Sequence, residues 1–320
     1  MPYFYRREVF QQALDIIWRK KYLWFLGFFA GLAAHGGEPD LLFRNTNSLR
    51  WLQDSVAILR DVVRGGQADQ FLANLRLFFN NYTLNAVGYL AVLILILVVI
   101  LWLVIVSQSA IVRVVGRASQ KKQTSLFDGL ATGTEKFWSL LTVNVVTKLF
   151  TWALWIIVAG IPAIAFFVTG QAAWAITFSL GSLLVTLPIS IVVSFLTKYA
   201  IAAITLGGTD TIGGLRQAWK IFRDNWLVSI ELAVLIYLFN LAVVLVVAGV
   251  TLLVVQTVTS FREFFTLLTV LAIVHSFVSA FSYAAWTTVY QKLLISKGES
   301  QLGYWTTKLT NFIQPKRSLG

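Results

Sequence analysis

The stretch that decides the fold begins with GGLRQAWKIFRDNW at residues 213–226 and continues with LVSIELAVLIYLFNLAVVLVVAGVTLLVV. Apolar residues recur every three or four positions from Leu215 to Trp226, which predicts an amphipathic helix with one apolar face. Basic residues lie off that face, and the long apolar run after Trp226 carries a single charge, Glu231. A basic interfacial helix, a tryptophan at the level of the headgroups and then an apolar helix are typical of a chain that enters a bilayer from the cytoplasm.

Two other segments follow the same order of features. Gly129-Leu130 and Ala13-Leu14 each lead through basic residues to a tryptophan and then to an apolar run. We therefore predict three parallel repeats, each made of an amphipathic helix and a helical hairpin. The predicted repeat units cover residues 4–112, 125–207 and 211–296 in outline. Because two spans per unit is an even number, all units would enter the membrane from the same side.

The composition indicates a membrane protein. Of 320 residues, 58% are apolar and 12% are charged, whereas about 25% charged residues are usual in a soluble domain. The net charge of +12 does not indicate nucleic-acid binding, because the basic residues lie beside apolar runs, as topology signals do. Cysteine is absent, which excludes disulfides, zinc–thiolate sites and a thiol nucleophile. We predict an all-α polytopic membrane helical bundle that forms a single membrane domain over residues 1–320.

About six spans are expected. Five long apolar runs are the clear ones, and they cover residues 84–111, 137–169, 172–206, 227–258 and 264–295. The first run, Tyr22–Ala34, is shorter than the ~20 residues that a straight crossing needs. It could be a short span, a re-entrant helix or a cleaved signal. Gly27 and Gly31 within it form a G-x-x-x-G pattern, which lets a neighbouring helix approach closely.

The orientation is predicted from lysine and arginine near the ends of the spans. Basic residues gather in the N-terminal segment, in the connections at 112–136 and 207–226, and in the tail at 297–320. By the positive-inside rule these segments are cytoplasmic. The sequence thus predicts a multi-pass protein of the cell membrane with both termini in the cytoplasm. The polar segment 35–83 is predicted to be a helical insertion on the extracytoplasmic side.

Polar residues within the predicted spans form a candidate intramembrane site, because an ionisable group at the bilayer centre costs about 2.5–3.5 kcal/mol and is often functional. The candidates are Lys148, Glu231, His275, Asn144 and Asn240. One hypothesis pairs Lys148 with Glu231 across adjacent units, with the two asparagines as neutral partners. The alternatives are that Lys148 and Glu231 reach the headgroups separately, and that His275 is a hydrogen-bonded packing residue.

Basic residues beside the spans form candidate contacts to anionic lipids, where each contributes about 1 kcal/mol. These are Arg113, Arg117, Lys121, Lys122, Arg216, Lys220 and Arg223. The alternative is that they only set the topology.

No pattern of catalysis is found. The sequence has no P-loop, no G-x-G-x-x-G after a strand, no H-E-x-x-H and no G-x-S-x-G. We therefore expect no catalytic residue, no cofactor and no metal. The favoured function is a non-enzymatic membrane module that organises lipids or partner subunits. The alternative is a transporter or permease with Lys148, Glu231 and His275 at the repeat interface.

The recurring small-Leu pair, basic residues, tryptophan and apolar hairpin resemble a broad group of poorly characterised bacterial polytopic membrane proteins. That group is similar to the membrane domain attached to some glycerophosphoryl diester phosphodiesterases. The resemblance implies a membrane domain only, because catalysis in those enzymes belongs to a separate soluble barrel. No catalytic residue carries over to this chain.

Overall fold

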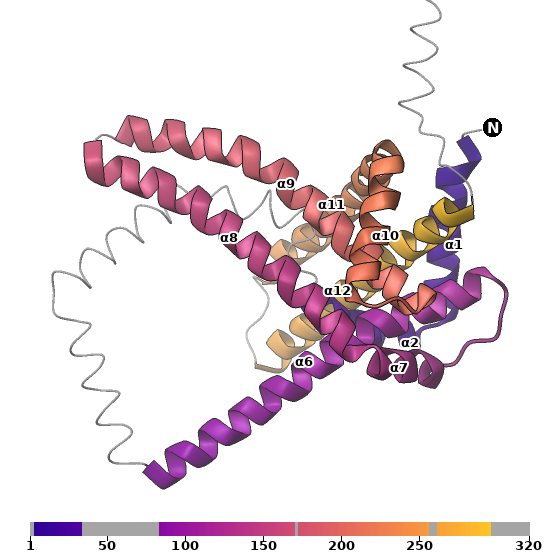
Figure 1. Ribbon diagram of the computed structural model, residues 1–320. Coiled ribbons are helices and arrows are strands. Elements are labelled where there is room, and N and C mark those ends of the chain that lie inside the picture. The colour runs from indigo at the N-terminus through magenta and orange to yellow at the C-terminus, as the bar shows by residue number, and fades with distance from the viewer. Residues whose placement is uncertain (1–2, 34–82, 170–171, 256–260, 296–320) are drawn as a thin grey trace, which may run out of the picture. The chain divides into compact units, whose positions relative to one another are not determined.

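The computed structural model describes residues 3–33, 83–169, 172–255 and 261–295. Almost all of the predicted insertion at 35–83, and the whole predicted tail at 297–320, lie outside these ranges. Within them every regular element is a helix and no strand occurs (Figure 1). The helices are α1 (Tyr3–Arg19), α2 (Tyr22–Ala33), α6 (Thr83–Ser119), α7 (Leu126–Glu135), α8 (Phe137–Thr169), α9 (Ala172–Gly207), α10 (Thr211–Asp224), α11 (Trp226–Val255) and α12 (Phe261–Ile295). The predicted all-α fold class is confirmed.

Five of these helices are long and apolar enough to cross a bilayer, namely α6, α8, α9, α11 and α12. The protein is therefore a multi-pass membrane protein. Helix α2 is apolar but has only 12 residues. At 1.5 Å per residue it is about 18 Å long, well short of the ~30 Å hydrocarbon core. The sixth predicted span is thus a short apolar helix.

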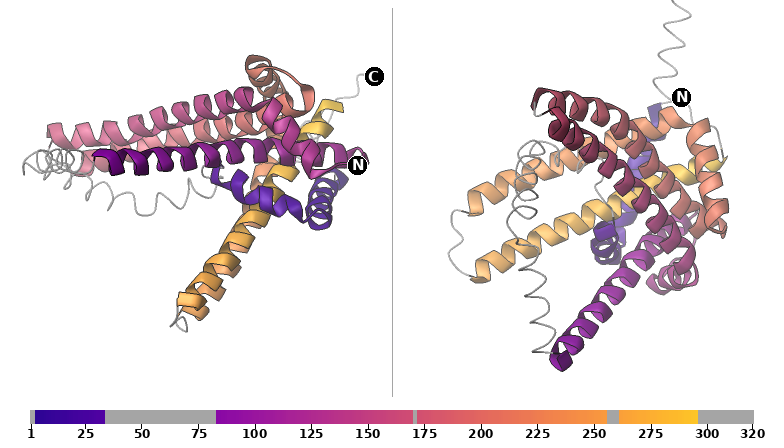
Figure 2. Two further views of the ribbon diagram at one scale, coloured as in Figure 1. Left: turned by 90° about the horizontal axis from the view of Figure 1, so that it is seen from below. Right: turned by 60° about the vertical axis from the view of Figure 1, so that its left-hand side comes forward.

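The chain divides into two compact units. The first unit contains α1, α2, α7, α10, α11 and α12, together with residues 104–119 of α6, 137–147 of α8 and 192–207 of α9. The second contains the remaining parts of α6, α8 and α9. In the second unit α8 and α9 run side by side as a hairpin (Figure 2).

The second unit presents apolar side chains outward. From Val87 to Trp102, every large apolar side chain of α6 is exposed, and so are Leu149, Trp152 and Ile156 of α8. A soluble protein rarely exposes so continuous an apolar surface. In a bilayer the same surface contacts lipid chains, as expected for spanning helices.

Small residues bring the helices of the first unit together. In α2, Gly27 lies against Ser276 and Ala280 of α12, and Gly31 lies against His275 and Ser279. The G-x-x-x-G pattern is therefore the contact face of α2. Where no hydrophobic effect drives helices together, close van der Waals packing of small residues is a main attraction between them.

The two glycines of α7 serve the same purpose. A Cβ on Gly129 would lie 3.0 Å from the carbonyl oxygen of Ala110 in α6, and one on Gly133 would lie 2.7 Å from that of Val106. In α10, a Cβ on Gly214 would lie 2.7 Å from Ile204 of α9. Helices α7 and α10 thus each pack back onto the span that precedes them.

Helix α1 packs onto α12. The ring centroids of Phe10 and Phe281 are 4.7 Å apart, and Lys292 pairs with Glu8 at 3.3 Å. Ala13, which the sequence analysis aligned with Gly129, is fully buried.

Candidate functional site

Helix α10 turns one face to the protein and another outward. Its N-cap is Asp210, whose carboxylate accepts a hydrogen bond of 3.0 Å from the backbone N–H of Gly213 and so satisfies one free donor of the first turn. The buried residues are Gly214, Ala218 and Ile221. They recur at spacings of four and three, which places them on one side of the helix.

The outward face of α10 combines basic and apolar side chains. Arg216, Lys220 and Arg223 are exposed. Ile212 is 66% exposed and Trp219 is 49% exposed beside them. Among the described residues, Arg223 is the one of the three with a carboxylate nearby, since its Nε lies 3.5 Å from Asp224. Tryptophan and basic side chains on one exposed helix face are typical of the headgroup region of a membrane.

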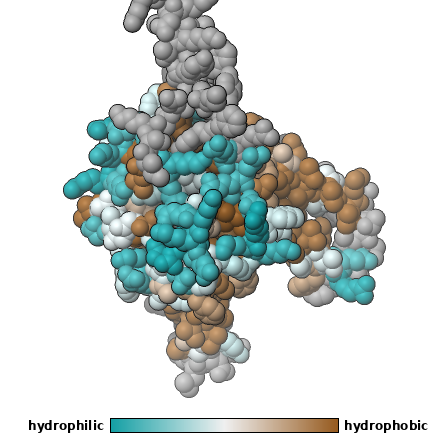
Figure 3. Space-filling model, turned by 90° about the vertical axis from the view of Figure 1, so that its right-hand side faces the viewer, coloured by the Kyte–Doolittle hydropathy of each residue, from teal (hydrophilic) through white to brown (hydrophobic). Residues whose placement is uncertain are grey.

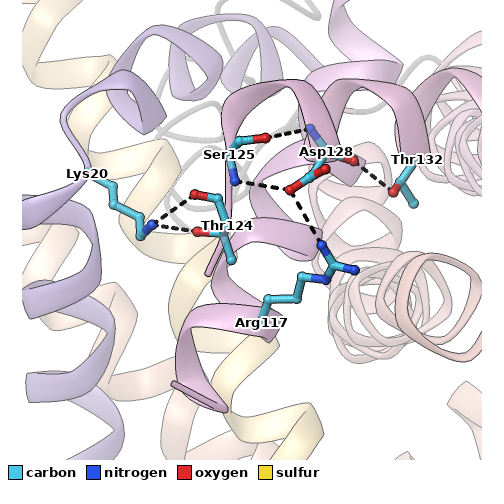
Figure 4. A network of polar contacts seen from close by, with 6 residues as sticks. All are labelled: Lys20, Arg117, Thr124, Ser125, Asp128 and Thr132. Atoms are coloured by element: carbon cyan, nitrogen blue, oxygen red, sulfur yellow. Dashed lines mark hydrogen bonds and ion pairs between the residues drawn. The ribbon is translucent and has the colours of Figure 1, made fainter. Parts of the chain in front are cut away.

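A second basic group lies where α6 ends and α7 begins (Figure 4). Ser125 and Asp128 form a capping box at the start of α7, and Arg117 of α6 reaches Asp128 at 3.4 Å. On the other side, the Lys20 Nζ donates to the side-chain hydroxyl and backbone carbonyl of Thr124. These contacts hold the turn between α6 and α7 at both ends. Lys121 and Lys122 lie in this turn and are exposed.

All seven predicted lipid-contact residues lie in the first unit. Five of them are exposed, whereas Arg113 and Arg117 are half-buried. Figure 3 shows hydrophilic side chains gathered on the face of the molecule that it presents. The aromatic side chains of Phe127 and Trp138, at the starts of α7 and α8, are 79% and 75% exposed.

Buried polar side chains pair with one another between the spans. The Asn144 side-chain amide of α8 donates to Gln108 of α6 at 3.0 Å. Ser109 of α6 bonds Thr205 of α9 at 3.1 Å, and the Tyr199 hydroxyl lies 2.8 Å from that of Ser229. These bonds satisfy polar groups that would otherwise lie unpaired among apolar side chains.

Gln108, the partner of Asn144, is not among the residues predicted from the sequence. The signal that could have found it is Ser107-Gln108-Ser109, three consecutive polar residues inside an otherwise apolar span. All three are buried.

The other predicted intramembrane residues belong to different units of the chain. Glu231 is buried in the first unit, whereas Lys148 is half-buried and belongs to the second unit. Their pairing stays a prediction. His275 is exposed on α12, and its ring lies against Gly31 of α2. The Asn240 side-chain oxygen is buried and accepts no hydrogen bond from the residues that the structure describes.

The comparison with known proteins gives a family. Residues 62–293 match the model of a domain of unknown function (DUF7847), which runs from before α6 almost to the end of α12. No curated protein and no solved structure matches the chain. The resemblance to the membrane domain of the phosphodiesterases stays a prediction. Because the match covers most of the chain, the protein belongs to the DUF7847 family.

Proposed function

We propose that the protein is a non-enzymatic module of the cell membrane that binds and organises anionic lipids at the cytoplasmic face, where both of its termini lie. The observation that carries this proposal is the outward face of α10. There Arg216, Lys220 and Arg223 are exposed next to Trp219 and Ile212.

The placement of α10 supports this function. Its small residues hold it against α9, so it is attached to the spanning bundle and its orientation is set by the protein. The apolar side chains of the outward face suit the boundary of the acyl chains, and the basic ones suit the lipid phosphates. Each basic residue near an anionic surface contributes about 1 kcal/mol.

The transporter alternative has less support. Transport requires a polar path, and polar residues along such a path would face a water-filled cavity. The buried pairs Gln108–Asn144 and Ser109–Thr205 bond each other between helices. This arrangement favours a packed centre with a structural role for these residues.

The test compares lipid retention by the full-length protein in mixed micelles of phosphatidylglycerol and phosphatidylcholine, scored by native mass spectrometry. The variant carries Arg216→Gln, Lys220→Gln and Arg223→Gln. Three residues contribute about 3 kcal/mol at most, and Asp224 neutralises part of this, so we expect the preference for phosphatidylglycerol to fall by tenfold or more.

The control variant, with Arg216→Lys and Arg223→Lys, keeps the charge and should keep the preference. An unchanged preference in the neutral variant would refute the proposal. Equal loss in the control would show that the effect comes from altered packing and not from charge.

A further inference from the structure

Arg113 is a half-buried basic residue without a counter-charge among the residues that the structure describes. It lies six residues before the end of α6, roughly 9 Å along the axis. Its neighbours Val112, Val114 and Val115 are at most 2% exposed. The Nε atom is buried and has no hydrogen-bond partner, and the guanidinium makes no ion pair with any residue that the structure describes.

The carboxylates of the described ranges are already engaged elsewhere. Three of them pair with a basic residue: Glu8 with Lys292, Asp15 with Arg19 and Asp128 with Arg117. Glu135 and Asp224 each pair with the basic residue next to them, and Asp210 caps α10. Glu231 and Glu263 also have interactions of their own. The described part of the chain therefore supplies no anion to Arg113.

A half-buried charge without a partner is costly, and the cost falls when an anion binds. A guanidinium presents a planar fork of N–H donors that matches the oxygens of a phosphate in a bidentate way. No described carboxylate supplies this anion, and a phosphate fits the donor geometry.

The surroundings point to a lipid as the source of the phosphate. One turn before Arg113, Ala110 is covered by Gly129 of α7. Two residues before that glycine, Phe127 is 79% exposed and can contact acyl chains. Beyond the end of α6, Lys121 and Lys122 are exposed and add positive charge.

We infer that Arg113 binds the phosphate of an anionic phospholipid at the junction of α6 and α7, as a defined site within the lipid-binding surface. The inference rests on the proposed function and adds one specific residue and one ligand group to it. It differs from the general attraction at α10, because the guanidinium is half-buried and depends on the bound lipid for its counter-charge.

The experiment measures thermal unfolding of the full-length protein in a zwitterionic detergent, alone and with added phosphatidylglycerol. Wild-type protein should be stabilised by phosphatidylglycerol, since a ligand that binds only the folded state raises the midpoint. Arg113→Met should lose most of this stabilisation. Without anionic lipid it should be at least as stable as the wild type, because the unpaired charge is gone. Arg113→Lys should keep part of the shift.

Two further measurements distinguish a lipid from a small free anion, and a specific effect of Arg113 from a general loss of positive charge. Millimolar inorganic phosphate should not reproduce the shift, and if it does, the site binds a small anion and the lipid inference is wrong. The Arg19→Gln variant removes one exposed charge from α1, outside the proposed lipid-binding residues, and should keep most of the shift.

Destabilisation of Arg113→Met by the same amount with and without lipid would mean that the guanidinium is structural, and would overturn the inference. An unchanged lipid shift in Arg113→Met would overturn it too, while loss of lipid preference in the α10 triple variant would still support the proposed function. If Arg113→Met loses the lipid shift while the α10 triple variant keeps its preference for phosphatidylglycerol, the Arg113 site is supported and the role of α10 is refuted.

Discussion

Replacing Gly27 by alanine should loosen α2 from α12, whereas the same change at Gly31 should be tolerated. A methyl group on Gly27 would overlap the backbone carbonyl oxygen of Ser276 and lie 2.8 Å from the Ala280 Cβ. A carbonyl oxygen within a helix cannot rotate away, so α2 itself must move. A methyl group on Gly31 would meet the ends of the His275 and Ser279 side chains, which can adopt other rotamers, and it would lie 3.1 Å from the Ser279 Cβ, a milder contact than those at Gly27.

The expected effects follow from two opposing terms. Inserting a methyl group into a close contact costs about 1–3 kcal/mol. Alanine in place of glycine favours a helix by about 1 kcal/mol. The two terms leave Gly27→Ala destabilised by up to roughly 2 kcal/mol and Gly31→Ala close to zero. Gly249 of α11 has nothing within 4 Å of an added Cβ. Gly249→Ala should therefore gain about 1 kcal/mol of helix propensity without a packing cost.

The assay is thermal unfolding of the three variants in one detergent, followed by intrinsic tryptophan fluorescence. At about 2–4 °C per kcal/mol, the midpoint of Gly27→Ala should fall by several degrees below that of Gly249→Ala. Gly31→Ala should lie between them. If Gly27→Ala unfolds at or above the temperature of Gly249→Ala, the close contact between α2 and α12 does not stabilise the protein and the reasoning fails.

Three other predictions concern the spans. Asn144→Leu leaves Gln108 buried without its partner and should cost about 0.6–2 kcal/mol in thermal unfolding, part of which the double variant with Gln108→Leu recovers. If Lys148 pairs with Glu231, Glu231→Gln alone should reduce the yield of folded protein more than Glu231→Gln with Lys148→Met; equal yields would remove the pairing. Reporter fusions after Lys121 and at the C-terminus should both report the cytoplasm, and reporters on opposite faces would contradict the positive-inside orientation.

Helix lengths and turns could be predicted from the sequence because both depend on local patterns. The predicted hairpin at 137–206 corresponds to α8 and α9, which end and begin on either side of Gly170-Gln171. The last predicted hairpin likewise agrees with α11 and α12 to within a few residues. A long apolar run has few alternatives to a helix in lipid, because every backbone group must be bonded within the segment.

The contacts between helices could not be predicted in the same way. The partner of Asn144 is 36 residues away in the sequence, and that of Ser109 is 96 residues away. No motif in the sequence indicates either pairing, because the packing of the whole bundle determines which spans become neighbours. The G-x-x-x-G of α2 identified a contact face, but not that α12 would cover it.

The apolar periodicity of α10 has a different meaning in lipid from the one it has in water. The predicted apolar face of α10 runs through Leu215 and Trp219, yet the residues buried against the protein are Gly214, Ala218 and Ile221. At the first two positions the buried residue is the small one that precedes the large one. In a soluble protein the large apolar residues would point to the core. Next to lipid they gain as much by facing outward, and the small residues are left to pack against another helix.

The small residue of the recurring small-Leu pair is thus the one that packs. Gly129 places α7 on α6, Gly214 places α10 on α9, and the buried Ala13 belongs to α1, which packs on α12. Because this small face packs against the spans, large and basic side chains such as Trp219 and Lys220 are left exposed, which suits the lipid contact proposed above. A change at one of the small residues should therefore alter lipid contacts indirectly, by releasing the helix, whereas a change at Arg216 or Lys220 should alter them without affecting stability.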